Sequence, residues 1–80
     1  MPRTLASPRH EALRALLVER RKAAGLTQQR VASKLGRYQS YVAYLESGQR
    51  RIDVIEFLEL SEAIGFDPFK LLRKLKHTKR

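Results

Sequence analysis

Apolar residues recur every three or four positions along most of this chain, which is the spacing of one face of an α-helix. The pattern predicts helices over residues 8–24, 28–35, 39–47 and 54–64, and a short last helix that opens at Asp67 and Pro68. No stretch shows the strict alternation of apolar and polar residues that indicates a β-strand. We therefore expect an all-α fold of five helices.

Residues that favour helix ends stand at these boundaries. Ser7 and Pro8 suit the N-cap and first position of the first helix, and Thr27 can cap the second. Asp53 and Glu56 have the spacing of a capping box at the start of the fourth. Glycines follow the first four helices: Gly25, Gly36, Gly48 and Gly65.

The apolar stripes predict which side chains form the core. The expected inward residues are Leu13, Leu16, Leu17, Ala24, Val31, Ala32, Leu35, Val42, Leu45, Phe69, Leu72 and Leu75. A chain of 80 residues buries only about 60% of its unfolded surface, which supports a single core. We expect a flexible N-terminal arm over residues 1–6, one domain over residues 7–75 and a basic flexible tail over residues 76–80.

Charge is positive overall and unevenly distributed. The chain carries 17 Lys and Arg against 8 Asp and Glu, a net charge of +9. A basic surface favours nucleic-acid binding, because Lys and Arg displace counterions from phosphates. The alternative is a solvated basic surface. Residues 52–67 hold five acids and no base, and we expect the acids of the fourth helix to face solvent, away from DNA: Asp53, Glu56, Glu59 and Glu62.

The third predicted helix is an exception to this basic composition. Residues 38–45, YQSYVAYL, contain no charged side chain. Two short helices joined by three residues form a helix-turn-helix unit, whose second helix lies in the DNA major groove. Bases are recognised by hydrogen bonds and apolar contacts, whereas phosphates attract charge. The window therefore predicts base contacts by Gln39, Ser40, Tyr41 and Tyr44.

Other interpretations of this window stay open. Gln39 and Ser40 can instead satisfy free N–H groups at the start of a helix, and Tyr41 can cover the side of the core. Tyr38 is expected to pack towards Val42 as a hydrophobic staple.

Basic residues flank the third helix at both ends. Arg37 precedes it, and Arg50 and Arg51 follow it, which makes them candidate phosphate ligands. Lys34 is a weaker candidate. The basic run from residue 70 to 80 is another, although terminal charge runs are usually only solvated.

Over about residues 21–69 the sequence resembles the helix-turn-helix domains of lambda repressor and Cro. The resemblance is carried by Arg21 with AGLTQ at 24–28, VASKLG at 31–36, QSYV at 39–42, LESG at 45–48, RRID at 50–53 and AIGFDP at 63–68. It implies five helices, binding to double-stranded DNA as a homodimer, and commonly repression from an operator that overlaps a promoter.

The resemblance also implies roles for single residues. It makes Gln28 a phosphate ligand that braces Gln39, gives Gln39 an adenine to recognise, and gives Ser40 a guanine or a neighbouring base. Tyr41 and Tyr44 stand where relatives often carry smaller or more polar residues. A phenol can donate to a phosphate or base edge, or lie against a thymine methyl.

Two further sets of residues have predicted structural roles. The resemblance matches both members of a structural ion pair, Arg21 and Glu46. Phe69, Leu72 and Leu75 have the helical spacing of core residues, but a short last helix leaves little core to hold all three. Part of this stripe is therefore a candidate dimer contact.

The sequence offers no chemistry for an enzyme, a metal or a cofactor. It has no cysteine, its two histidines lie far from other candidate ligands, and it has no glycine-rich phosphate loop. With neither a signal-peptide run nor about 20 consecutive apolar residues, we expect no membrane contact and a cytoplasmic protein. The resemblance to lambda repressor and Cro implies a bacterial or phage-encoded, nucleoid-associated protein. No small-molecule ligand is expected. The competing interpretation is a protein-binding adaptor or antitoxin-like module that uses the C-terminal apolar stripe.

Overall fold

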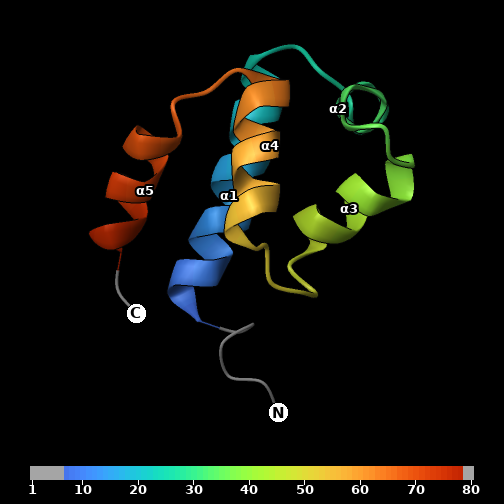
Figure 1. The fold of residues 1–80 in the computed structure, drawn as a ribbon. Coiled ribbons are helices and arrows are strands. Elements are labelled where there is room, and N and C mark those ends of the chain that lie inside the picture. Colours follow the sequence, from blue (N-terminus) through green and yellow to red (C-terminus); the bar gives the residue numbers. More distant parts are fainter. Residues whose placement is uncertain (1–6, 79–80) are drawn as a thin grey trace.

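A computed structural model of the protein describes residues 7–78 and shows five α-helices and no strand in that range (Figure 1). The helices are α1 (Pro8–Ala23), α2 (Gln28–Leu35), α3 (Gln39–Ser47), α4 (Val54–Ile64) and α5 (Pro68–Lys76). The all-α expectation is confirmed, and α2, α3 and α4 have their predicted bounds. Helix α5 continues to the first residue of the predicted tail. The predicted arm and the last two tail residues lie outside the described residues.

The N-termini of α2 and α4 are capped by the side chains that the sequence predicted. The Thr27 hydroxyl accepts from a backbone N–H in the first turn of α2. In α4 the capping box is complete, since Asp53 Oδ1 accepts from the Glu56 N–H at 2.7 Å and Glu56 Oε1 accepts from the Asp53 N–H at 3.1 Å. These bonds satisfy N–H groups that have no partner within their own helix.

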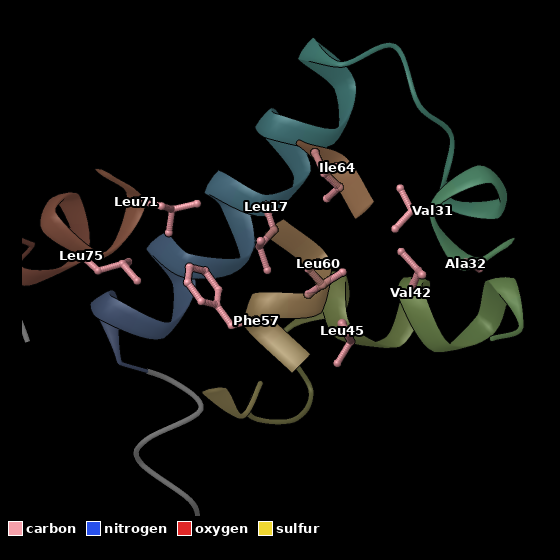
Figure 2. Close-up of a cluster of buried hydrophobic side chains, with 10 residues drawn as sticks. All are labelled: Leu17, Val31, Ala32, Val42, Leu45, Phe57, Leu60, Ile64, Leu71 and Leu75. Carbon is pink, nitrogen blue, oxygen red and sulfur yellow. The ribbon is translucent and has the colours of Figure 1, made fainter. Parts of the chain in front are cut away.

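Apolar side chains from all five helices meet in one core (Figure 2). In Figure 1, α4 crosses in front of α1, with α5 on one side and α2 and α3 on the other. Leu17 of α1 is 2% exposed, and the residues buried with it are Val31, Ala32, Val42, Leu45, Phe57, Leu60, Ile64, Leu71 and Leu75. The core therefore joins the helix-turn-helix to the rest of the domain.

The last helix turns a different face inward from the one expected. Leu71 and Leu75 are buried, whereas Phe69 is 69% exposed and Leu72 is 46% exposed. The predicted inward stripe is therefore wrong at Phe69 and Leu72. Leu75 belongs to the core, and burial removes it from the candidate dimer contacts. Ala24 is also exposed, because α1 ends one residue before it.

A buried ion pair connects α1 to α3. Arg21 Nε and Nη2 donate to the two carboxylate oxygens of Glu46 at 2.7 and 3.0 Å, and the two side chains are 11% and 9% exposed. Arg21 Nη1 also donates to the carbonyl of Leu26 at 2.9 Å, in the turn before α2. The structure thus contains the ion pair that the resemblance implied.

Side chains in the first turn of α1 contact backbone carbonyl groups at the C-terminal ends of α3 and α5. His10 is buried, and its Nε2 lies 3.2 Å from the carbonyl oxygen of Gly48, which caps α3. Arg9 donates from Nε to the carbonyl of Leu75 and from Nη2 to that of Lys76, both at 3.0 Å. The last carbonyls of a helix lack partners inside the helix, so α1 supplies them for α3 and α5.

We expect Glu46→Ala to lower the free energy of unfolding by about 3–5 kcal/mol, because it leaves the Arg21 guanidinium buried without its carboxylate. Urea denaturation followed by circular dichroism measures this loss. The control is Glu59→Ala on the exposed side of α4, which should change the free energy by less than about 0.5 kcal/mol. Equal losses in the two variants would contradict a structural role for the pair.

Candidate nucleic-acid interface

Helices α2 and α3 are joined by the tight turn of a helix-turn-helix. Gly36 closes α2 in the left-handed conformation with φ of 68°, which a side chain would strain. The Arg37 N–H then donates to the carbonyl of Ala32 at 2.9 Å. Val42 and Leu45 of α3 are both 1% exposed and pack into the core. The opposite side of α3 is consequently the outward one.

The outward side of α3 carries neutral polar groups. Gln39 and Ser40 are exposed, and Tyr44 is 44% exposed. Ser40 and Tyr44 are four residues apart, so they share one helix face. Three of the four predicted base-contacting residues thus lie together on an accessible surface.

Gln39 is held by a chain of hydrogen bonds that begins in the core. Its Nε2 donates to Gln28 Oε1 at 2.7 Å, and Gln28 Nε2 donates to Glu46 Oε1 at 2.8 Å. An amide NH₂ carries two donors, so Gln39 keeps one N–H and its carbonyl oxygen free. One donor beside one acceptor is the pattern that matches the major-groove edge of adenine. Gln28 likewise keeps one N–H, which suits a phosphate.

Tyr41 lies at the side of α3 and is half-buried against the core. Its hydroxyl donates to Glu56 Oε2 of α4 at 2.8 Å. The guanidinium carbons of Arg37 and Arg50 lie over its ring, 4.6 and 5.8 Å from the centroid. Burial and the hydrogen bond to Glu56 raise the pKa of Tyr41. Of the two interpretations left open by the sequence, these contacts support a structural one.

Glu56 was expected to face solvent, but it does not. Its side chain is 13% exposed, whereas Glu59 and Glu62 are exposed. Glu56 Oε1 accepts from Arg50 Nη1 at 3.1 Å, and Oε2 forms a close ion pair with Arg50 Nη2. The hydrogen bonds from Arg50 are the largest cause that lowers the pKa of Glu56, from 4.5 to about 2. The expectation was wrong because the loop after α3 brings Arg50 close to α4, where it pairs with Glu56.

The four predicted cationic phosphate ligands have different surroundings. Arg37 and Arg51 are exposed, and their charge is accessible to solvent. Arg50 is paired with Glu56. Lys34 lines a shallow surface hollow with two acidic residues of α4. Arg50 is therefore the one of these four cations that is paired with a carboxylate among the described residues, and the exposed Arg37 and Arg51 fit a phosphate better.

Tyr38 is a surface residue, contrary to its predicted packing towards Val42. Tyr38 occupies the N-cap of α3, makes no side-chain capping hydrogen bond there and is 86% exposed. The staple interpretation is therefore wrong. The preferred N-cap residues are Ser, Thr, Asp and Asn. An aromatic residue at this position is therefore unusual, and this was the one signal in the sequence that Tyr38 has a role other than capping the helix.

Between residues 7 and 78, no group of three or more His, Asp or Glu side chains is arranged to hold a metal ion. Within that range, no helix combines the length and the apolar composition needed to cross a membrane.

Comparisons with known proteins agree with this geometry. Residues 17–71 match a family model described as helix-turn-helix. The chain is 38% identical over 52 residues to the uncharacterized HTH-type transcriptional regulator y4dJ of Sinorhizobium fredii, a match that covers 65% of this chain and 68% of that protein.

Solved structures show the same likeness. An XRE-family like protein from Pseudomonas syringae pv. tomato is 49% identical, with a TM-score of 0.84 over 92% of this chain and 90% of that one. The restriction-modification controller protein C.AhdI from Aeromonas hydrophila is 34% identical, with a TM-score of 0.70 over 78% of this chain and 94% of that one.

We expect Glu56 to stabilise the fold fully above about pH 4.5. Because folding lowers its pKa from 4.5 to about 2, the stabilisation is present above the unfolded value and is lost as the pH falls through the folded value. The difference in free energy of unfolding between wild type and Glu56→Gln should therefore be constant above pH 4.5 and shrink between pH 4.5 and about 2. Urea denaturation across this range measures it, and a constant difference down to pH 2 would contradict the assignment.

Proposed function

This chain belongs to the helix-turn-helix family of DNA-binding transcriptional regulators, and from that premise we propose that it binds an inverted-repeat operator as a dimer and represses transcription. The proposal rests on the hydrogen-bonded chain that runs from the Arg21–Glu46 pair through Gln28 to Gln39. An exposed glutamine contributes little to folding. Fixing its amide is useful when a ligand must find the donor and acceptor in one orientation.

In this proposal α3 lies in the major groove and supplies the base contacts. Gln39 binds adenine through its free N–H and carbonyl oxygen, and Ser40 and Tyr44 contact neighbouring bases. Phosphates are bound by the free N–H of Gln28 and by the exposed guanidinium groups, those of Arg37 and Arg51. Tyr41 has a different role, because its hydroxyl is already bonded to α4.

Dimerisation is supported by the size of the domain. The reading helices of a dimer lie about 34 Å apart, one turn of DNA. The domain measures 32 × 28 × 20 Å, which is comparable with that spacing, so two copies on one operator would lie side by side. Exposed apolar side chains are available for the contact on α5 and α4: Phe69, Leu72, Val54, Ile55 and Leu58.

Repression is the simplest consequence of such binding. A dimer that occupies an operator overlapping a promoter excludes polymerase, and neither a cofactor nor an effector is needed for that action. Selection of bound sites from a random pool of double-stranded DNA tests the proposal. Retention of one DNA sequence over bulk competitor at ~0.15 M salt supports it, whereas salt-sensitive, sequence-indifferent binding would favour the protein-binding alternative.

Base recognition and phosphate binding should be separable by mutation. We expect Gln39→Ala to reduce discrimination at one operator position by roughly 1–3 kcal/mol. Arg51→Ala should weaken binding to all DNA similarly and lower the slope of log affinity against log salt by about one. Both variants are measured on the selected operator, a single-base variant and random DNA across a salt series. Equal weakening on every DNA by Gln39→Ala would refute its role as a base-contacting residue.

The number of chains on the operator should be two. Because one α3 contacts only a few base pairs, we expect a symmetric dimer on half-sites whose centres lie about 10 base pairs apart. Leu72→Lys should favour one chain per operator by placing charge on the exposed face of α5, and Glu59→Lys is the matched surface control. Sedimentation of the complexes counts the chains, and one wild-type chain on a full operator would contradict the dimer.

A further inference from the structure

Arg50 is a surface arginine whose charge is already paired within the protein. It lies in the loop between α3 and α4 and donates from Nη1 to Glu56 Oε1 at 3.1 Å and from Nη2 to Oε2. Nη1 also donates to the carbonyl of Arg51 at 2.8 Å. A guanidinium that presents two nitrogens to two oxygens uses the same geometry for a carboxylate as for a phosphate. Glu56 therefore accepts from the same guanidinium donors that Arg50 would offer to a phosphate.

The carboxylate is held more firmly than the arginine. Glu56 accepts from the Tyr41 hydroxyl at 2.8 Å and from the Asp53 N–H at 3.1 Å, and its side chain is 13% exposed. The Arg50 side chain is 35% exposed. Glu56 thus stays in place on α4, and Arg50 is the partner that can exchange one anion for another.

Pairing changes what Arg50 contributes to DNA binding. The affinity that comes from counterion release depends on how many phosphates the protein neutralises. The Arg50–Glu56 pair carries no net charge, so it neutralises none while it remains closed. Nearby Arg51 differs, because it is exposed and no carboxylate lies within ion-pairing distance among the described residues.

We propose that Glu56 limits the affinity for DNA of any sequence by occupying the guanidinium of Arg50 in place of a phosphate. The inference rests on the proposed function, since it takes the loop after α3 to face DNA. Its consequence is that the neutral side chains of α3 supply a larger share of the binding free energy. Glu56 thereby acts as a specificity-determining residue without touching a base.

The test is a salt series on random-sequence DNA with wild type, Glu56→Gln and the matched control Glu59→Gln. Glu59 is an exposed carboxylate of the same helix, so its variant corrects for the general effect of removing one negative charge. We expect Glu56→Gln to bind random DNA more tightly than Glu59→Gln, with a salt slope steeper by about 0.9, the value for one additional phosphate. In the double variant Glu56→Gln, Arg50→Gln the slope should return to that of Glu59→Gln.

A measurement on wild type keeps the inference testable if Glu56→Gln does not fold. The Arg50 Nε–H resonance should move little when random DNA is added, whereas that of Arg51 should shift. An equal shift for both arginines would overturn the inference, as would equal salt slopes for the two glutamine variants. If wild type itself shows no salt-dependent binding to DNA, the proposed function fails as well, and this distinguishes the two failures.

Discussion

The buried contact between Arg21 and Glu46 is the constraint on which the orientation of α3 depends. A charge removed from water must keep its partner, so α3 cannot rotate about its axis without leaving both groups unpaired. Gln28 uses the same carboxylate and extends the constraint to α2. The position of the exposed Gln39 amide is therefore set by chemistry in the interior of the domain.

The net charge alone does not describe the electrostatics around α3, because the arginines there differ in their surroundings. The chain is strongly basic, yet its arginines divide into those that carry an accessible charge, such as Arg37, and those that are paired inside the domain, such as Arg50. Tyr41 lies between these groups and connects α3 to α4. A surface of this kind can attract DNA while leaving selection of the sequence to neutral side chains.

Local signals in the sequence were enough to predict the helices, because a cap or a stop depends on residues within about four positions. The inward face of α5 was not predictable in this way. Residues three apart differ by about 60° around a helix, so Phe69, Leu72 and Leu75 spread over about 120° of its surface. Packing of α5 against α1 and α4 buries Leu71 with Leu75 instead. The exposure of Gln39 and Ser40 was predictable because a run of neutral polar residues in a basic chain is visible in the sequence. The prediction for Glu56 was wrong because its partners Arg50 and Tyr41 lie 6 and 15 positions away, beyond the reach of such local signals.

The bonds from Arg9 to the end of α5 have a consequence for how this domain is made. They join residues that are 66 and 67 positions apart, and they supply partners for the carbonyl groups at the end of α5. A nascent chain on the ribosome has its arginine in place from the beginning but lacks the carbonyls until residue 76 has been synthesised. The domain can therefore close only after translation of its last helix, as one cooperative event.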